Sequence, residues 1–511
     1  MAEPLARESI VGVIGAGTMG AGIAEVAAAA GHPVRLHDSR PGAAAEACDA
    51  LAARLDKRVA RGKVVQAERD ALVARITPVD TLEALAPAAL VVEAIVEDLA
   101  VKRELFATLE GLVAADAILA SNTSSLSITA LGAGLARPER LVGMHFFNPV
   151  PVMQLVEVVH GLASDPGAVA TVLATASAWG KRAVRVASTP GFIVNRVARP
   201  FYAEALRLLQ EGAADAATLD AVYRDAGGFR MGPFELMDLI GHDVNFAVTR
   251  SVFEAFFHDP RYRPSLLQQE LVVAGRLGRK SGRGFYDYTD DAPRPEPCER
   301  PTAAAPDAIR VHGDLGPVTP LVEMAGAAGV VVEHVPAESG GWIEFGGARL
   351  ALTDGRTATA RAVHEGGDLV LLDLALDYAS ASRLAIAVAA QATPAAVDAA
   401  VGLLQALGKR VVQLQDTPGL ALMRTVSLLA NEGAEAVLQG VCDAAAVDDA
   451  MRFGVNYPRG PLAWGDAVGA ARVLTVLDHL TAAYGEDRYR ASPWLRQKVA
   501  AGRPLRDDES D

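Results

Sequence analysis

Cysteine, aromatic residues and long apolar runs are all scarce in this chain of 511 residues. Its three cysteines, Cys48, Cys298 and Cys442, lie far apart and form no CxxC pair, which argues against a disulfide framework and a zinc site. The sequence contains no run of 18 apolar residues, and its opening residues MAEPLARESI lack the apolar stretch of a secretory signal. We therefore expect a cytoplasmic protein with no metal and no membrane partner.

Positive charge is also in deficit. The chain carries 48 Lys and Arg against 62 Asp and Glu, a formal net charge of −14. Affinity for a polyanion depends mainly on clustered Lys and Arg. We expect no nucleic-acid partner, and an anionic ligand would need a locally basic site.

The first part of the chain has an alternating α/β pattern. Between Ile10 and Ala187, helical stretches such as Leu99–Val113 and Gly167–Trp179 alternate with strand-like runs, namely IVGVIG, PVRLHD, LVVEAI, AILASN, LVGMHF and LVEVV. This alternation is typical of a doubly wound, mostly parallel sheet. Residues 41–75 predict two further helices that project from the sheet as an antiparallel pair.

A helical region and a repeat follow. After Ser188 the strand signals stop, and up to Gly275 apolar residues recur at helical spacing. Five prolines between Pro293 and Pro306 predict a linker. At a constant offset of 228, six features of the helical region recur, among them Thr189-Pro190-Gly191, which recurs as Thr417-Pro418-Gly419. We infer that the second half duplicates the helical domain.

The α/β part before the second helical copy is degenerate. Strand-like runs survive between Ile309 and Gln415, but no intact GxGxxG does, and the nearest remnant is HGDLG at His312 to Gly316. The predicted segments are an α/β Rossmann-type domain (1–188), an all-α domain (189–290), a linker (291–307), a degenerate Rossmann-like domain (308–415) and a second all-α domain (416–511).

A glycine-rich turn between strand and helix predicts a dinucleotide site. In such a turn the first glycine permits the tight bend, the second lets the backbone approach a pyrophosphate, and the third packs helix against strand. Asp38, at the end of the next strand, can bond both ribose hydroxyls and would repel a 2′-phosphate, so NAD is favoured over NADP. The alternative is a tight turn without a ligand. The turn consists of Gly15, Ala16, Gly17, Thr18, Met19 and Gly20.

Two further segments carry candidate catalytic groups. His145 in GMHFFNPVP and Glu157 in QLVEVVH can meet on neighbouring strands as an imidazole and its orienting carboxylate, a general base. The alternative is a core histidine bonded to a backbone carbonyl. The loop SNTSS, residues 121–125, follows a strand at the edge where open α/β sheets bind ligands, or is simply a polar loop with a helix cap.

These motifs, in their order and spacing, resemble the L-3-hydroxyacyl-CoA dehydrogenase family. The matching segments between Ile10 and Tyr288 are GxGxMG, VVEAIVED, SNTSSL, HFFNPVPVMQLVEVV, TPGFIVNR, MGPFELMDLIG and GRKSGRGFYDY. The remaining chain resembles the longer bacterial members, which have a Rossmann-like linker domain and a second helical domain. The resemblance implies NAD-dependent oxidation of an L-3-hydroxyacyl-CoA to the 3-oxoacyl-CoA.

The resemblance also implies roles for single residues. His145 would be the catalytic base and Glu157 its partner. Ser124 would bond the 3-oxygen of the substrate, and Asn195 would position the substrate. The NAD contacts would be the turn residues, Asp38, and the residues near the nicotinamide ribose and in the SNTSS loop, namely Glu97, Lys102 and Asn122.

The resemblance says less about which acyl chain is bound and which residues contact coenzyme A. The long members act on 3-hydroxyadipyl-CoA or 3-hydroxybutyryl-CoA, in phenylacetate or butyrate metabolism, and the chain architecture favours the adipyl substrate. An adipyl chain would need a polar group at the far end of its pocket, and Arg230 or Arg199 could serve. Candidate coenzyme A contacts, which could equally be a solvated face, are the basic residues Lys57, Arg58, Arg61 and Lys63.

The second copy has lost the active residues. At the offset of 228, His145 corresponds to Asp373, Glu157 to Ala385, and Asn195 to Met423. We expect one NAD and one active site per chain, with the C-terminal copy docked on the first helical domain as a pseudo-twofold partner. The protein would be a monomer with an internal pseudo-dimer, or a homodimer. The alternative functions are a dehydrogenase of a free small hydroxy acid and a non-catalytic, crystallin-like scaffold.

Overall fold

The computed structural model describes residues 2–290, 292–337 and 340–506. Asp291, the first residue of the predicted linker, lies outside the described residues. The chain divides into two compact units, one of residues 1–196 with 440–455 and one of residues 197–439 with 456–511. In the described ranges, no helix has both the length and the hydrophobicity needed to cross a membrane.

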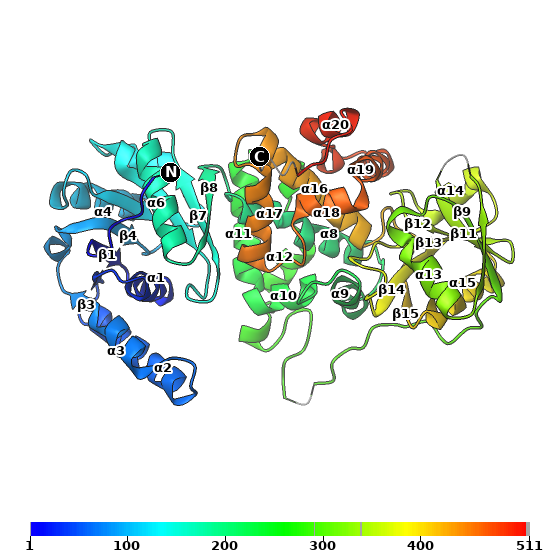
Figure 1. Cartoon of the computed structure of the whole chain (residues 1–511), viewed down its shortest axis with the longest axis horizontal. Helices are drawn as coiled ribbons and strands as arrows, with labels where there is room; N and C mark the ends of the chain where they lie inside the picture. Colours follow the sequence, from blue (N-terminus) through cyan, green and yellow to red (C-terminus); the bar gives the residue numbers. More distant parts are fainter. Residues whose placement is uncertain (1, 291, 338–339, 507–511) are drawn as a thin grey trace. The chain divides into compact units, whose positions relative to one another are not determined.

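The first unit contains an eight-stranded sheet in the order β3-β2-β1-β4-β5-β6-β7-β8 (Figure 1). Neighbouring strands are parallel, except that β6 and β7 are antiparallel. The doubly wound, mostly parallel sheet is confirmed, with β3 and β8 in addition to the predicted runs. The strands are β1 (Ile10–Ile14), β2 (Val34–His37), β3 (Ile76–Val79), β4 (Ala88–Glu93), β5 (Ile118–Ser121), β6 (Leu141–Phe146), β7 (Leu155–His160) and β8 (Arg182–Ala187).

Helices of the first unit bury the apolar faces of this sheet. Val13 of β1, Ile23 of α1 and Val172 of α6 belong to one buried cluster. The pair α2 and α3 extends away from the sheet beside β3, as predicted (Figure 1). The helices are α1 (Thr18–Ala29), α2 (Ala43–Ala60), α3 (Gln66–Ala74), α4 (Leu99–Leu112), α5 (Ile128–Gly132) and α6 (Pro166–Ala178), with the short 3-10 helices η1 (Leu82–Leu85) and η2 (Pro138–Arg140).

The second unit contains a seven-stranded sheet in the order β10-β9-β11-β12-β13-β14-β15. At the offset of 228, β13, β14 and β15 match β6, β7 and β8 and pair in the same directions. An antiparallel hairpin of β11 and β12 stands where the first sheet has β4, α4 and β5. The strands are β9 (Ala308–Gly313), β10 (Val331–Val335), β11 (Gly341–Phe345), β12 (Ala348–Leu352), β13 (Asp368–Leu372), β14 (Arg383–Val388) and β15 (Arg410–Gln413).

Helices form the rest of the second unit. Those beside the second sheet are α13 (Pro320–Ala327), α14 (Ala358–Glu365) and α15 (Pro394–Ala406), with η5 (Gly316–Val318). Those of the first helical copy are α8 (Arg199–Gln210), α9 (Ala216–Asp225), α10 (Pro233–Ile240), α11 (His242–Ala255) and α12 (Leu266–Val273), with η3 (Pro260–Tyr262) and η4 (Arg279–Ser281). Those of the second copy are α16 (Leu422–Leu438), α18 (Pro461–Val468), α19 (Ala470–Tyr484) and α20 (Pro493–Ala500), with η6 (Asp487–Tyr489).

The two helical copies exchange one helix each. In the first unit, α17 (Ala444–Val455) packs on β7 and β8, whereas in the second unit α9 packs on β14. The Ala187 N–H donates to the Val441 carbonyl at 2.8 Å, and the Gln415 N–H donates to the Ala213 carbonyl at the same distance. These two bonds join equivalent positions of the repeat. The compact units therefore do not coincide with the segments of the sequence repeat.

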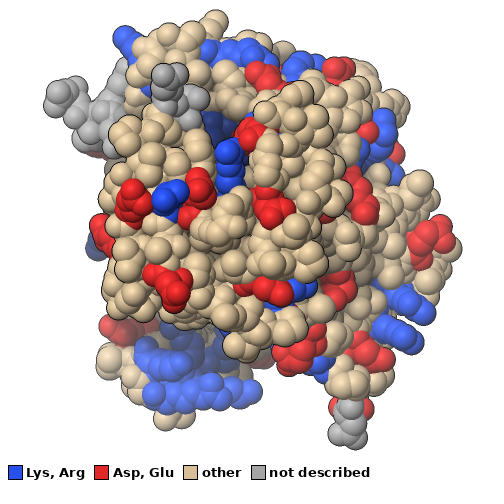
Figure 2. All heavy atoms as spheres, turned by 90° about the vertical axis from the view of Figure 1, so that its right-hand side faces the viewer, with Lys and Arg blue, Asp and Glu red and all other residues tan. Residues whose placement is uncertain are grey.

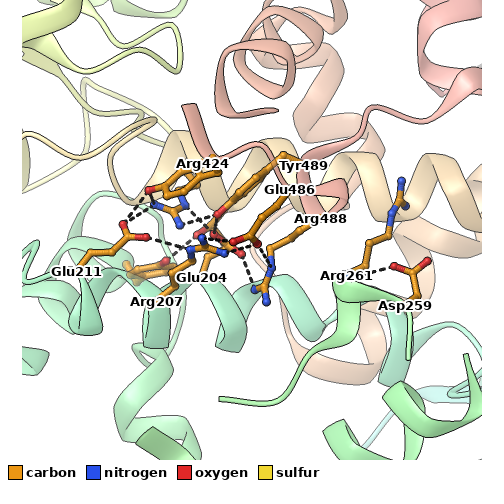
Figure 3. Close-up of polar contacts among 12 residues, drawn as sticks. Glu204, Arg207, Glu211, Asp259, Arg261, Arg424, Glu486, Arg488 and Tyr489 are labelled. Carbon is orange, nitrogen blue, oxygen red and sulfur yellow. Dashed lines mark hydrogen bonds and ion pairs between the residues drawn. The ribbon is translucent and has the colours of Figure 1, made fainter. Parts of the chain in front are cut away.

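The first helices of the two copies, α8 and α16, also meet through equivalent side chains. Glu204 on α8 accepts a hydrogen bond from the Tyr489 hydroxyl at 3.0 Å, and Glu432 on α16 accepts one from the Tyr262 hydroxyl at 2.5 Å. Arg424 on α16 reaches back to Glu204 at 2.6 Å (Figure 3). Each copy thus binds a buried glutamate of the other through a tyrosine hydroxyl, and we call these two contacts, together with the Arg424 bond to Glu204, the clamps.

The described part of the linker, residues 292–307, contains neither helix nor strand, as its prolines predict. It nevertheless lies against the second sheet, because the Arg300 N–H donates to the Val411 carbonyl at 2.8 Å and the Ala303 N–H donates to Gln405 Oε1 at 2.9 Å. Figure 2 shows the face that includes this sheet. Acidic and basic residues are interspersed on most of it, and neutral residues cover more of it than either.

Candidate active site

The glycine-rich turn between β1 and α1 requires its glycines. Gly15 has a φ of +98°, and a Cβ there would lie 2.5 Å from the Ala94 carbonyl oxygen. A Cβ on Gly20 would overlap the Gly15 carbonyl, whereas Gly17, which precedes the first turn of α1, faces open space. Backbone N–H groups at the start of a helix bind anions. The turn therefore fits the phosphates of a dinucleotide.

Asp38 follows β2 and is bonded to this turn. Its Oδ2 accepts from the Ala16 N–H at 2.7 Å and its Oδ1 from the Arg40 N–H at 2.9 Å. Burial acts to raise the pKa of Asp38, but these two backbone bonds outweigh it and hold the pKa below its ordinary value. A carboxylate is thus fixed beside the turn, where the ribose of a dinucleotide bound there would lie.

Glu97 organises the SNTSS loop after β5. Its Oε1 accepts from Thr123 Oγ1 at 2.6 Å, from the Ser124 N–H at 2.9 Å and from the Ser125 N–H at 3.1 Å. Burial acts to raise the pKa of Glu97, but the Thr123 bond and the charge of Lys102 lower it overall. The structure therefore brings together Glu97, Lys102 and Ser124.

Lys102 lies beneath this loop rather than at its surface. It is 1% exposed, and its ammonium lies 2.8 Å from both oxygens of the Glu93 carboxylate and 3.4 Å from Glu97. Ser121 donates to the same Glu93 carboxylate. A buried pair of this kind holds its surroundings in one arrangement. Glu93 was missed by the sequence reasoning, although the VVEAIVED motif contains it.

Asn122 joins β5 to β6. Its Oδ1 accepts from the Phe146 N–H at 2.9 Å, one residue after His145. The side chain thus ties the loop that carries Ser124 to the strand that carries the candidate base.

His145 and Glu157 are direct partners in the register of β6 and β7. His145 Nδ1 lies 2.7 Å from Glu157 Oε2, and the two residues are 6% and 0% exposed. The rings of Phe147 and Phe192 lie 4.5 Å and 5.8 Å from the imidazole. Because the carboxylate occupies Nδ1, the proton sits there and Nε2 is left to accept a proton.

The second carboxylate oxygen of Glu157 binds the backbone rather than the imidazole. Its Oε1 accepts from the backbone N–H groups of Ile193 and Val194 at 2.9 and 3.0 Å. These residues open the short helix α7 (Val194–Val197), which carries the half-buried Asn195. One carboxylate therefore fixes both the imidazole and the helix start beside Asn195, a role that the spacing of the motifs did not reveal.

The remaining candidates differ in their exposure. The basic residues on and after α2 are exposed, namely Lys57, Arg58, Arg61 and Lys63. Of the two candidates for the far end of the acyl chain, Arg230 is exposed and Arg199 is buried. In the described part of the chain, no group of His, Cys, Asp and Glu side chains is arranged to hold a metal ion.

The second copy has lost both kinds of site. Asp373, at the position of His145, accepts the N–H groups of Ala421, Leu422 and Met423 at 2.8 to 3.0 Å, which is the task of Glu157 in the first copy. Burial raises the pKa of Asp373 to about 6. In the HGDLG remnant, a Cβ on Gly316 would lie 2.5 Å from the Arg472 guanidinium. The Arg472 side chain therefore occupies the space beside this glycine.

Three protein-family models match most of the chain. The family model described as "3-hydroxyacyl-CoA dehydrogenase, NAD binding domain" matches residues 10–189. The model of the C-terminal domain of the same enzymes matches residues 191–288 and again 419–510. Between them, a "3-hydroxybutyryl-CoA dehydrogenase reduced Rossmann-fold domain" matches residues 350–418.

Individual relatives agree with these matches. The chain is 46% identical over 489 residues to the "3-hydroxyadipyl-CoA dehydrogenase" of Escherichia coli, covering 96% of this chain and 97% of that protein. It is 45% identical over 282 residues to a "Probable 3-hydroxybutyryl-CoA dehydrogenase" of Bacillus subtilis, covering 54% of this chain and 96% of that protein. A crystal structure titled 3-hydroxybutyryl-CoA dehydrogenase from Escherichia coli K12 has a TM-score of 0.88 and 44% identity, covering 97% of this chain and 98% of that one. The chain therefore belongs to the 3-hydroxyacyl-CoA dehydrogenase family.

Proposed function

We propose that this protein oxidises an L-3-hydroxyacyl-CoA to the 3-oxoacyl-CoA, with His145 as the base. The observation that carries the proposal is the 2.7 Å contact between His145 and the buried Glu157. It sits in the same unit as a glycine turn that fits a dinucleotide. When bound, NAD supplies the acceptor for the hydride that leaves C3 of the substrate.

The residues of the chain handle the proton and the orientation. His145 Nε2 takes the proton of the 3-hydroxyl group, and Glu157 stabilises the imidazolium that results. Ser124 donates a hydrogen bond to the reacting oxygen, and Asn195 orients the thioester. Lys102 and Glu93 lie beneath the SNTSS loop, where they hold Glu97 and the loop that carries Ser124 in place.

Asp38 supports the choice of cofactor. Its carboxylate accepts ribose hydroxyls, and its charge opposes the 2′-phosphate of NADP. For coenzyme A, the exposed basic residues at the end of α2 supply the local positive charge that the net charge of −14 does not.

Turnover measurements separate this function from its alternatives. We expect NADH oxidation with acetoacetyl-CoA and none with free acetoacetate, because the thioester carries the coenzyme A that the basic residues bind. Absorbance at the NADH band reports both reactions. Turnover of only the free acid would make the protein a dehydrogenase of a small hydroxy acid, and turnover of neither would leave the scaffold function.

We also propose that the second helical copy replaces a subunit contact, so that the protein is a monomer with an internal pseudo-dimer. The reciprocal clamps at Glu204 and Glu432 support this proposal. A chain that ends after Tyr288 would lose the partners of Glu204 and expose a buried carboxylate. We expect it to dimerise or aggregate, whereas the full chain has the mass of one copy in light scattering. A truncated chain that is monomeric, soluble and fully active would contradict this proposal.

A further inference from the structure

The helix α17, which the second helical copy supplies, packs on the strand that carries Glu157. Successive side chains of a strand point to opposite faces, so Leu155 and Glu157, two residues apart on β7, lie on the same face. A Cβ built on Gly454, near the end of α17, would lie 2.5 Å from Leu155 Cδ2. All three residues belong to the first unit. The backbone of α17 therefore closes on the face of β7 from which Glu157 projects.

Gly454 also lies against the segment that binds the second oxygen of Glu157. The same Cβ would lie 3.1 Å from Val194 Cγ2, and the Val194 N–H donates to Glu157 Oε1 at 3.0 Å. Leu155 and Val194 are both buried. One glycine thus lies between the two segments that fix the Glu157 carboxylate, namely its own strand and the start of α7.

Two bonds hold α17 at this place, one at each end of β8. At the start of the strand, Arg182 Nε donates to Asp449 Oδ2 at 2.7 Å, and Arg182 is the register partner of Leu155. At the end of the strand, the Ala187 N–H donates to the Val441 carbonyl at 2.8 Å. The helix therefore cannot slide along the sheet without breaking an ion pair or a backbone hydrogen bond.

The segment before α17 lies close enough to Glu157 to respond to its charge. Burial raises the pKa of the half-buried Cys442 thiol, and the charges of Asp443 and Glu157 raise it further. Glu157 itself is 0% exposed. A hydrogen bond is electrostatically stronger in such water-free surroundings. Residues of the second copy thus contribute to the environment in which Glu157 binds the imidazole.

We propose that Gly454 is a positioning residue that holds the Glu157 carboxylate against His145. Its lack of a side chain lets α17 approach Leu155 and Val194, whose positions determine that of the carboxylate. This inference rests on the proposed function of the dyad. The second helical copy then does more than replace a subunit contact, because it completes the surroundings of the catalytic pair.

Gly454→Val tests the inference in the full chain. The new side chain would have to displace Leu155 or Val194. We expect kcat, expressed per NADH-binding site, to fall about 10- to 100-fold, because a misplacement of about 1 Å can cost about 100-fold. The dissociation constant of NADH should not change, and a fluorescence titration gives both this constant and the number of sites. Leu155→Val removes the atom that the new side chain would meet, so it should restore part of kcat in Gly454→Val.

Gly465→Val is the matched control. Gly465 is likewise a buried glycine inside a helix, α18, and a Cβ there would lie 2.9 Å from Leu505 Cδ1 and 3.1 Å from the Ala430 Cβ. These three residues belong to the second unit. We expect a similar fall in unfolding temperature for the two valine variants, but no change of kcat per NADH-binding site in Gly465→Val.

A double variant separates positioning from a general loss of stability. In Glu157→Gln the carboxylate is already absent, so adding Gly454→Val should have little further effect on kcat per NADH-binding site. Substitutions that act through one shared contact are not additive. A residue that only supports the fold would lower the activity of the Glu157→Gln chain as much as that of the unsubstituted chain.

Three results would overturn the inference. They are an unchanged kcat per site in Gly454→Val, equal losses in Gly454→Val and Gly465→Val, and fully multiplicative losses when Gly454→Val is combined with Glu157→Gln. If Gly454→Val does not fold, Gly454→Ala and Gly465→Ala give the same comparison with a smaller side chain. Absence of turnover in the unsubstituted chain would instead refute the proposed function itself.

Discussion

Replacing His145 by glutamine is expected to lower kcat by about 10³- to 10⁴-fold, because glutamine cannot take the hydroxyl proton at neutral pH. The dissociation constant of NADH should change little, since the glycine turn and Asp38 do not contact His145 in the structure. Stopped-flow or steady-state NADH absorbance gives kcat, and protein fluorescence gives cofactor binding.

Glu157→Gln is the informative companion. An amide can donate a hydrogen bond to Nδ1, which would move the imidazole proton to Nε2 and block the base. We expect a loss of kcat of roughly the same order as in His145→Gln, and less than multiplicative losses in the double variant. If His145→Gln retained more than about a tenth of the activity, the assignment of the base would be wrong.

Arg424→Ala is expected to lower the free energy of unfolding by about 3 to 5 kcal/mol, because it leaves buried partners without their counter-ion. Arg424 is fully buried and donates to Glu204 at 2.6 Å, to Glu211 at 3.1 Å and to the hydroxyls of Tyr484 and Tyr489 (Figure 3). Chemical denaturation at pH 7 measures the change if the transition is reversible.

The matched control is Arg310→Ala, which removes a 3.0 Å pair with Glu333 whose side chains are 58% and 63% exposed. An exposed pair contributes less than about 1 kcal/mol. The combined variant Arg424→Met with Glu204→Leu should recover only part of the loss, since it removes two buried charges but takes the Glu204 partner from Arg488. Equal effects of Arg424→Ala and Arg310→Ala would show that the clamp does not stabilise the fold.

The clamp should also resist mild acid. Burial acts to raise the pKa of Glu204, but the charges of Arg424 and Arg488 outweigh it and hold the pKa below its ordinary value. The stabilisation by this carboxylate is therefore present above a pH of about 4.5 and is lost only as the pH falls through the lowered pKa. The effect of Arg424→Ala should thus be similar at pH 6 and pH 8.

Much of the site follows from local sequence patterns. The turn of Gly15 to Gly20 and the β6–β7 pair of His145 and Glu157 depend on short-range rules, namely a positive φ, a helix start and cross-strand pairing. The offset of 228 similarly identified the degenerate copy and its lost residues. The turn and the dyad could be predicted because each is determined within a few dozen residues, and the repeat because its register has no gap.

Other features depend on contacts between distant segments and left no local signal. The position of α17 on β7 and β8 joins segments more than 250 positions apart, and nothing in Ala444–Val455 differs from an ordinary amphipathic helix. The burial of Arg199 is likewise a property of its surroundings in three dimensions. The sequence could only name it beside Arg230, without deciding which of the two is buried.

The hydrogen bonds of Asp373 oppose the return of a catalytic histidine to this position. Its carboxylate holds the backbone at Ala421, Leu422 and Met423, while Ala385 stands where a glutamate would be needed. Restoring a histidine at position 373 would leave these N–H groups without an acceptor and would still lack a partner for the imidazole. Return to a second catalytic centre requires at least two simultaneous replacements, each damaging alone. Single replacements therefore do not restore a catalytic centre in the second copy.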